Sequence, residues 1–557
     1  MKKLFLRRAQ SQHGARASAR FTIHSTKAHE LRGVLELYTS KRRERRAPLA
    51  PFVCHTISKA SILRCSIISL LFLTAGLLNA AEPVAASDQS GVHNVLDYDA
   101  KGDGVTDDTA AIQKAIDRCA AAGGGQVVLP GGKTFLTGAI TLRSGIDFHL
   151  ARGAVLKGSA RWQDYGEAGA LVFAKGATGI SISGDGVLDG NDQAVWQKLA
   201  DEEAGGNVNK PGWWPQSFCG VWWPFGRSAE DKSLKPGRPM VVLLIGCQQV
   251  RLRDFTIRNA PSWTVHPVGC EDVAIDSISI RNDWNVANND GIDLDHCRNV
   301  RIANCHIDTA DDGIVIKNTP NFAGYGRSEN ITVTGCTIAS RSCALKLDEI
   351  YTSPGVRNVV FDACTIFRSN RGLCIQSRDV GDIENVIFSN ITIETQVQPS
   401  KWWGAGEPIH ISHLPRTKDT KLGHVRQIRF SNILCQGENG LYLKGCAAQP
   451  LEDIVFDNVR VEVGKTGGVR GGFYDDRPNG PPVNGVFTGI YTNSIAGIHC
   501  EFARCLTFRN TQVVWGERGE DFYGAALESR HVEGLKLEQF SGKAARPGQT
   551  PDQIVEE

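Results

Sequence analysis

The sequence has few methionines, little net charge and no apolar run long enough for a stable membrane span. Its 557 residues include two methionines, Met1 and Met240, and carry a formal net charge of +2. Much of the positive excess lies within the first fifty residues, so we expect no nucleic-acid-binding face in the rest of the chain. No nucleotide-binding loop, zinc-ligand set or serine triad stands out, and we therefore expect neither a cofactor nor a resident metal.

One apolar stretch near the N-terminus has the pattern of a secretory signal. Residues 61–80, SILRCSIISLLFLTAGLLNA, place an arginine before an apolar run and end in small residues suited to cleavage near Ala80 or Ala81. We interpret residues 61–81 as a signal peptide and residues 1–60 as a disordered, over-extended leader. The remainder is expected to be secreted or periplasmic and free of the membrane after cleavage.

A repeat of apolar and polar residues runs through the middle of the chain. Segments such as RDFTIRN, ANCHIDT and DNVRVEV alternate with a period of two and recur at intervals of 23 to 42 residues. Their equivalent residues are Phe255, Ile278, Cys305, Cys336, Cys364, Ile391, Ile433 and Val459. This spacing is typical of an all-β solenoid whose coils stack like residues on one another. The three cysteines are expected to act as small core residues, although a bridge between coils about 4.8 Å apart would also be possible.

A solenoid grows coil by coil, so residues 92–540 can form a single domain despite their number. Residues 103–125 predict a short N-terminal capping helix with Thr106 or Asp107 as its N-cap. Ile112, Ile116 and Cys119 would pack against the first coil. Residues 541–557 are expected to be a C-terminal tail.

The second strand of each coil predicts which side chains face outward. When segments such as DGIDLDH, DGIVIKN and CALKLDE are aligned, their aliphatic residues fall into two columns, which we place in the core of the solenoid. Strict alternation then sends the intervening residues to the outer surface. This outward strip consists of Asp293, Val315, Lys346, Cys374, His410 and Tyr442, with Asp295, Lys317, Asp348, Gln376, Ser412 and Lys444 beside them, and His266 alongside Asp295. We expect the strip to be exposed and to bind an extended polymer.

Two acidic turns start successive strands of this strip. Asp290 precedes Gly291, and Asp311 and Asp312 precede Gly313. Asp-Gly pairs are common in ordinary tight turns, but two of them on successive coils favour paired carboxylates that protonate a glycosidic oxygen and activate water. Crowding of like charges would keep one of these groups protonated.

These motifs resemble glycoside hydrolase family 28, the polygalacturonases and related enzymes, whose fold is a right-handed parallel β-helix. NND at 288–290 resembles the family's Asn-Thr-Asp motif, and ADDG at 310–313 resembles its Asp-Asp motif. The resemblance implies a single-stranded, all-β, right-handed parallel β-helix. It also implies Asp290 as a general base, Asp311 as the general acid and Asp312 as a second water-activating base.

The chain departs from the family at two other motifs. Cys343 stands where the family's Gly-His-Gly has histidine, and Cys374 and Gln376 replace the two cations of its Arg-Ile-Lys. The acid and base are therefore expected to be kept while the sugar-binding subsite is rebuilt. Arg371, Arg378 and Lys346 could still hold a uronate, but a neutral or differently substituted sugar is equally open.

Tryptophan pairs interrupt the coil period at residues 213–223 and at Trp402 and Trp403. Such loops serve as sugar-stacking platforms or as small anchoring cores. If these insertions close one end of the substrate groove, they would favour exo action. Together with these tryptophans, the residues we expect to bind substrate are His266, Asp293, Lys317, Lys346, Arg371, Gln376, Arg378 and His410.

The sequence therefore predicts a monomeric glycoside hydrolase that cleaves a pectin-type polysaccharide with inversion. Two alternatives stay open. A polysaccharide lyase would hold Ca²⁺ on the aspartates and use Lys317 or Lys346 as its base. A non-catalytic glycan-binding rod would need the aromatic residues without the acid pair.

Overall fold

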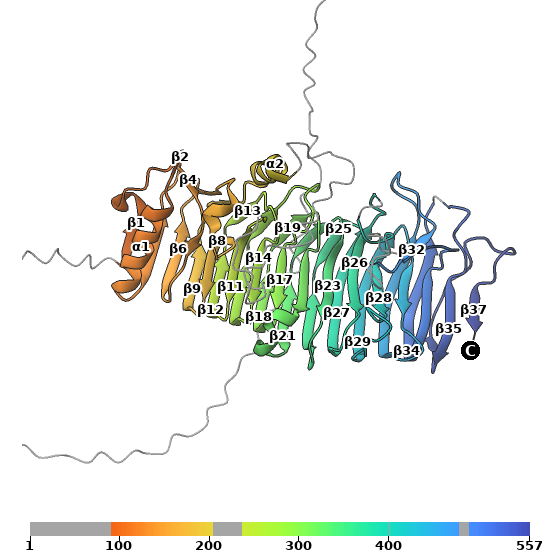
Figure 1. Ribbon diagram of the computed structural model, residues 1–557. Coiled ribbons are helices and arrows are strands. Elements are labelled where there is room, and N and C mark those ends of the chain that lie inside the picture. The colour runs from red at the N-terminus through yellow and green to blue at the C-terminus, as the bar shows by residue number, and fades with distance from the viewer. Residues whose placement is uncertain (1–90, 204–236, 400–401, 478–488, 518, 557) are drawn as a thin grey trace, which may run out of the picture. The chain divides into compact units, whose positions relative to one another are not determined.

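The computed structural model describes residues 91–203, 237–399, 402–477, 489–517 and 519–556. The predicted leader at 1–60 and the predicted signal peptide at 61–81 lie outside these residues. Within them, 35 strands join in one parallel sheet that winds into a right-handed β-helix, which confirms the predicted fold class. Figure 1 shows the successive coils side by side along this part of the chain. None of the helices in the described residues is long and apolar enough to span a bilayer.

The coils present three faces, each a column of parallel strands. Face 1 contains β5 (Ile140–Thr141), β8 (Ala170–Lys175), β11 (Met240–Ile245), β14 (Val265–Val268), β17 (Ile292–Asp295), β20 (Ile314–Asn318), β23 (Cys343–Ile350), β26 (Arg371–Ser377), β28 (Ile409–His413), β30 (Leu441–Lys444), the start of β34 (Ile498–Trp515), β35 (Leu527–Glu533) and β37 (Gln553–Glu556). Face 2 contains β1 (Val92–Asn94), β3 (Gly125–Leu129), β6 (Ile146–Leu150), β9 (Thr178–Ser183), β12 (Gln248–Arg253), β15 (Glu271–Asp276), β18 (Arg298–Ala303), β21 (Ser328–Thr334), β24 (Val356–Asp362), β27 (Ile383–Thr395), β29 (Val425–Gly437) and β31 (Leu451–Val463). Face 3 contains β2 (Asp103–Asp107), β4 (Thr134–Thr137), β7 (Val155–Gly158), β10 (Val187–Asp189), β13 (Thr256–Arg258), β16 (Ser279–Arg281), β19 (His306–Thr309), β22 (Thr337–Ser340) and β25 (Thr365–Ser369). Strand β36 (Lys536–Glu538) pairs with residues 507–509 of β34 and continues face 2.

The register of face 1 confirms the predicted inner ladder. Ile292 pairs with Ile314, which pairs with Leu345, and the ladder continues through Leu373 to Ile409. All five side chains are buried in the main hydrophobic core. The predicted column from Phe255 to Val459 is buried as well, and its three cysteines are free thiols.

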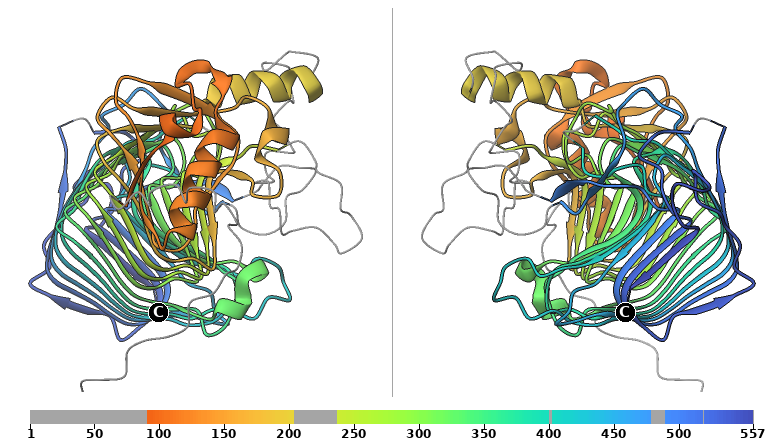
Figure 2. Two further views of the ribbon diagram at one scale, coloured as in Figure 1. Left: turned by 90° about the vertical axis from the view of Figure 1, so that its left-hand side faces the viewer. Right: turned by 90° about the vertical axis from the view of Figure 1, so that its right-hand side faces the viewer.

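The predicted cap is helix α1 (Thr109–Ala121), which lies across the N-terminal end of the coils (Figure 2). Ile112, Ile116 and Cys119 are buried, as predicted. The N-cap is Asp108 and not Thr106 or Asp107, because the Asp108 carboxylate folds back to accept from Lys101 N at 2.6 Å and Gly102 N at 3.0 Å. The helix begins where this tight loop ends.

A few short elements decorate the coils. These are helix α2 (Asp192–Glu203), the 3-10 turns η1 (Val95–Tyr98), η2 (Trp162–Tyr165) and η4 (Pro320–Tyr325), and the antiparallel pair β32 (Phe473–Asp475) and β33 (Ile490–Thr492). Strand β37 pairs with β35, so strand pairing continues past residue 540, where we expected only a tail.

Candidate active site

Two Asp-Gly steps place carboxylates at the same corner of successive coils. Gly291 leads into β17 and Gly313 leads into β20. A Cβ on Gly291 would lie 2.4 Å from the Gly313 carbonyl oxygen, and one on Gly313 would lie 2.6 Å from that of Ala344. Since the backbones approach so closely, only glycine fits at these two positions. Asp290 and Asp312, each one residue earlier, therefore lie next to each other at the start of face 1.

Asp290, Asp311 and Asp312, which we predicted to be catalytic, form one compact cluster. One carboxylate oxygen of each lies within 4.8 Å of those of the other two. Asp290 and Asp312 are 3% and 5% exposed, whereas Asp311 is only partly buried. Three oxygens at this spacing suit a divalent cation as well as proton transfer. Asp311 is therefore the most accessible of the three carboxyl groups.

Burial and mutual repulsion change the charge state of this cluster. Burial, followed by the charge of Asp312, raises the pKa of Asp311 to about 6. Burial, followed by the charges of Asp293 and Asp311, raises the pKa of Asp290 well above its usual value. The cluster therefore retains a proton at mildly acidic pH.

Asp312 is held by two side chains of the next coil. Lys346 Nζ lies 3.0 Å from Asp312 Oδ2, and the Ser342 hydroxyl donates to Asp312 Oδ1 at 2.8 Å. Lys346 also lies 2.9 Å from Asp348, which in turn lies 3.1 Å from Arg378. Although burial lowers the pKa of Lys346, Asp312 and Asp348 raise it well above its usual value. Lys346 is therefore a fixed positive charge beside the cluster.

Lys317 holds the opposite end of the cluster. Its ammonium nitrogen lies 3.5 Å from Asp290, 3.1 Å from Asp293 and 3.7 Å from Glu349. It also lies 3.9 Å from the centroid of the Trp263 ring, a cation–π contact. Burial lowers the pKa of Lys317, but Asp293 and Asp290 raise it well above its usual value.

His266 lies beside Asp295, as predicted. Its Nε2 is 3.6 Å from Asp295 Oδ2, and its ring meets that of Trp263 edge-on at 4.8 Å. Asp295 also accepts from the Thr319 backbone N–H at 2.9 Å and from the Thr319 hydroxyl at 2.6 Å. The segment that carries η4 is thereby tied to face 1.

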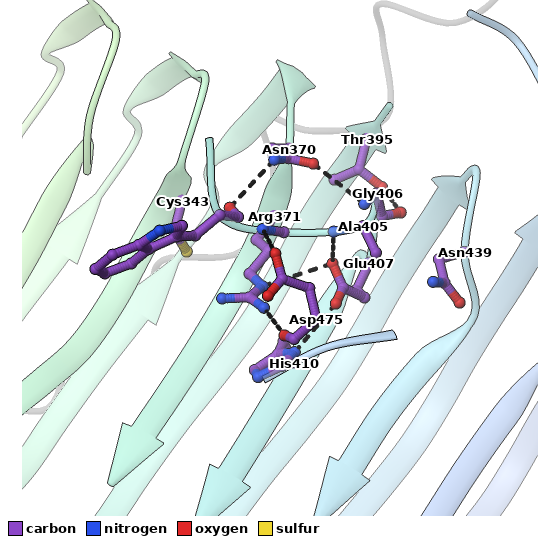
Figure 3. A network of polar contacts seen from close by, with 12 residues as sticks. Cys343, Asn370, Arg371, Thr395, Ala405, Gly406, Glu407, His410, Asn439 and Asp475 are labelled. Atoms are coloured by element: carbon purple, nitrogen blue, oxygen red, sulfur yellow. Dashed lines mark hydrogen bonds and ion pairs between the residues drawn. The ribbon is translucent and has the colours of Figure 1, made fainter. Parts of the chain in front are cut away.

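A second polar network follows the cluster along the strip (Figure 3). Arg371 Nε lies 3.5 Å from Glu407 Oε2, and His410 Nδ1 lies 3.2 Å from Glu407 Oε1. Arg371 also donates to the Asp475 carbonyl oxygen. Gln376 Nε2 donates to the backbone carbonyl of Arg477 at 2.8 Å. Residues 402–407 and 473–477 are therefore fastened over β26 and β28.

The prediction that the outward strip is exposed was wrong. Its side chains face away from the aliphatic core, but His266, Asp293 and His410 are fully buried, and Lys317 and Lys346 are 5% and 4% exposed. Alternation determines the side of a strand on which a residue lies, but not what covers that side. Here η4 and residues 402–407 and 473–477 lie over the strip.

Three cations that we expected to bind a uronate have partners within the protein. Lys346 lies between Asp312 and Asp348, Arg378 pairs with Asp348, and Arg371 faces Glu407. Cys343, which stands in place of the family's histidine, and Cys374, which stands in place of one of its cations, are buried thiols.

The tryptophan prediction is altered at one position. Trp402 is 5% exposed, which fits a loop anchor, whereas Trp403 is partly exposed. The tryptophans of residues 213–223 lie outside the described residues.

The sequence reasoning missed Ser342, Glu407 and Asp475. Ser342 has the same register as Asp311 one coil earlier, so the strand alignment could have identified it. Glu407 and Asp475 lie in segments that break the coil period, where no local pattern indicates contact with face 1.

Comparisons with known proteins agree with this geometry. The sequence model described as "Glycosyl hydrolases family 28" matches residues 119–469, which include the three clustered aspartates. A Vitis vinifera protein named "Probable polygalacturonase" is 25% identical over 468 residues, covering 77% of this chain and 87% of the relative. The Dickeya chrysanthemi exo-poly-α-D-galacturonosidase is 29% identical over 342 residues, covering 54% of each chain.

The crystal structure of an exopolygalacturonase from Thermotoga maritima superimposes with a TM-score of 0.55 at 26% identity. That match covers 67% of this chain and 87% of the other. Fold, acidic cluster and sequence similarity agree, so the protein is a polygalacturonase-like glycoside hydrolase and belongs to glycosyl hydrolases family 28.

Proposed function

We propose that this enzyme hydrolyses α-glycosidic bonds of a pectin-type polysaccharide built from galacturonate or rhamnogalacturonan-like units. Asp311 acts as the general acid, and Asp290 and Asp312 activate the attacking water. The observation that carries this proposal is the unequal surroundings of two neighbouring carboxyl groups. Asp311, on the accessible side, has a pKa raised to about 6, while Asp312 pairs with the Lys346 ammonium. An acid and a base side by side are what glycosidic hydrolysis requires.

In the proposed reaction, Asp311 gives its proton to the glycosidic oxygen as the bond to the anomeric carbon breaks. Water attacks that carbon and loses a proton to Asp290 or Asp312, and Asp311 regains a proton from solvent. The attack comes from the face opposite the leaving group, so the product anomer is inverted.

The stereochemical part of this proposal rests on the family resemblance. Oxygens of the three carboxylates lie within 4.8 Å of one another, whereas carboxyl groups of inverting enzymes are usually about 6.5–9.5 Å apart. Proton NMR of the first product formed decides the point. An inverted anomer supports the proposal, and a retained anomer contradicts it.

A lyase would need a neutral lysine to abstract a proton. Carboxylates raise the pKa values of both candidate bases, Lys317 and Lys346, well above the usual value. Permanently protonated lysines are poor bases, which supports hydrolysis over elimination.

The proposal includes export and a monomeric state. The signal-like stretch at 61–81 supports export. Exo action is proposed because residues 402–407 and 473–477 cover the strip beyond the cluster. The full chain, expressed with its signal-like segment, should be recovered outside the cytoplasm, and light scattering should give the mass of one chain.

The central test compares the wild-type enzyme with Asp311→Asn on polygalacturonate and rhamnogalacturonan. We expect wild type to release reducing ends without the ultraviolet absorbance of unsaturated sugars, and the variant to lose about 10²-fold or more of that activity. Asp185→Asn, which alters an exposed pair with Arg152, serves as the control and should retain full activity. Unsaturated product would indicate a lyase. Full activity of Asp311→Asn would remove it as the acid, and binding without turnover by wild type would indicate a glycan-binding rod.

A further inference from the structure

Five cations on and next to the strands of face 1 are already neutralised by the protein. Each of them lies within ion-pairing distance of a carboxylate: Lys317 with Asp290 and Asp293, Lys346 with Asp312 and Asp348, Arg371 with Glu407, Arg378 with Asp348, and Lys444 with Asp476 and Glu501. A uronate substrate brings one further negative charge for each sugar. Its carboxylate therefore has to find a positive charge elsewhere around the catalytic cluster.

Arg341 lies at the same corner of the coils as the catalytic aspartates. It stands between Ser340, whose hydroxyl donates to the Asp311 carbonyl at 2.6 Å, and Ser342, whose hydroxyl donates to the Asp312 carboxylate at 2.8 Å. Both neighbours of Arg341 thus touch catalytic residues. Arg341 is partly exposed, like Asp311.

The Arg341 side chain is held in place by neutral groups. Its Nη1 donates to the Trp284 carbonyl at 2.8 Å and to Asn285 Oδ1 at 3.2 Å. Its guanidinium carbon lies 5.5 Å from the centroid of the Trp284 ring and 5.8 Å from that of Trp402. These contacts orient the guanidinium without cancelling its charge.

No carboxylate among the described residues forms an ion pair with Arg341. Its Nε is buried and has no hydrogen-bond partner. Burial lowers the pKa of Arg341, and the charge of Asp283 opposes this effect only in part. A half-buried guanidinium with no carboxylate at ion-pairing distance in the described part of the chain is energetically costly, and a planar carboxylate is the group that its fork fits best.

We infer that Arg341, framed by the indoles of Trp284 and Trp402, binds the carboxylate of a uronate unit beside the bond that is cleaved. Arg341 is then a specificity-determining residue that compensates for the two cations replaced by Cys374 and Gln376. The inference rests on the proposed function and deepens it, because it selects an acidic sugar over a neutral one at this site.

The test measures binding of trigalacturonate by calorimetry in the otherwise full-length Asp311→Asn enzyme, which should bind without cleaving. We expect Arg341→Gln to raise Kd about 10-fold or more. The Kd of Arg341→Lys should lie between that of Arg341→Gln and that of the parent, because lysine keeps the charge but loses the planar fork. A carboxyl-reduced, neutral trisaccharide should bind weakly and equally to all variants. The thermal midpoint of Arg341→Gln should equal or exceed that of its parent.

Arg368→Gln is the matched control. The Arg368 guanidinium carbon lies 4.8 Å from the centroid of the same Trp284 ring, but Arg368 pairs with Asp308 at 3.3 Å. Its replacement should change Kd by less than about twofold, since that charge is already neutralised. An unchanged Kd in Arg341→Gln, an equal loss in Arg368→Gln, or an equal loss with the neutral trisaccharide would each overturn the inference.

Binding and turnover separate this inference from the proposed function. If wild type cleaves polygalacturonate while Arg341→Gln binds trigalacturonate normally, the inference fails and the proposed function stands. If binding depends on Arg341 but wild type cleaves no pectic polymer, the proposed function fails and the uronate site stands.

Discussion

Asp290 is the residue at which catalysis and stability should conflict most directly. Its pKa is raised in the folded protein by burial and by the charges of Asp293 and Asp311. A carboxyl group that binds its proton more tightly when folded destabilises the folded state as pH rises through the folded pKa, and it has no such effect below the unfolded pKa.

We therefore expect Asp290→Asn to be more stable than wild type at pH 7, by about 1 kcal/mol or more, since each unit of pKa shift corresponds to about 1.4 kcal/mol. The gain should disappear near pH 4. Urea unfolding at both pH values measures it, with Asp185→Asn, in an exposed pair, as the control. A gain of equal size at both pH values would show that ionisation of Asp290 is not its cause.

Lys346 should control the pH dependence of the reaction through its contact with Asp312. Removing a positive charge makes a neighbouring carboxylate harder to ionise. In Lys346→Gln, we therefore expect the acidic limb of the kcat/KM profile to move to higher pH and the maximum to fall about 10-fold or more. The alkaline limb should move in the same direction, because the charge of Lys346 also lowers the pKa of Asp311. Lys346→Arg, which keeps the charge, should restore the position of the limb.

Lys444→Gln is the control for this change, because Lys444 pairs with Asp476 and Glu501 on a later coil of the same face. Its profile should match wild type. In wild type and in Lys444→Gln, the alkaline limb of the profile should lie near pH 6, where Asp311 loses its proton. A Lys346→Gln profile that is lowered but not displaced would mean that Lys346 acts only on folding or packing.

At the level of elements, a phenylalanine stack ties face 2 together. Phe430 in β29 stacks on Phe388 in β27 at 4.9 Å and on Phe456 in β31 at 4.5 Å. Equivalent rings extend the stack to Phe361 and Phe508. Because the coils keep one register, identical side chains meet face to face.

Phe430→Ala removes the middle ring of the stack and should cost about 3–5 kcal/mol of unfolding free energy. Leu434→Ala, on the same strand but 55% exposed, should cost less than about 1 kcal/mol. Urea denaturation of both variants provides the comparison. Equal losses would mean that β29 is stabilised by its strand pairing and not by its buried face.

At the level of the whole molecule, the covered half of face 1 should decide how a polymer is cut. Arg371 and Gln376 fasten residues 473–477 over β26. A chain that cannot extend past the cluster is cleaved near its end. Viscosity of polygalacturonate should therefore fall slowly while reducing ends accumulate, and the early products should be short.

A rapid fall in viscosity at few cleaved bonds would contradict this prediction of exo action. Glu407→Gln supplies a second comparison, since it weakens the pair that holds Arg371 and His410 beneath the covering segments. We expect this variant to lower viscosity sooner than wild type at equal numbers of cleaved bonds.

The sequence by itself determined the solenoid, its inner ladders and the position of the carboxylate cluster. These follow from local rules that need no knowledge of the rest of the chain. Period-two alternation assigns Ile292 and Ile314 to the inside, and an Asp-Gly pair at the start of successive strands aligns Asp290 with Asp312, because coils repeat in register.

Only the tertiary structure decided what lies over that face and which charges are neutralised. Glu407 and Asp475 reach Arg371 from segments outside the repeat, and Asp348 reaches Lys346 and Arg378 within it. A side chain's burial and its ion pairs depend on distances between segments remote in sequence, and no local pattern encodes those distances. For this reason the strip predicted to be open is covered, and the cations predicted to grip the substrate are already paired.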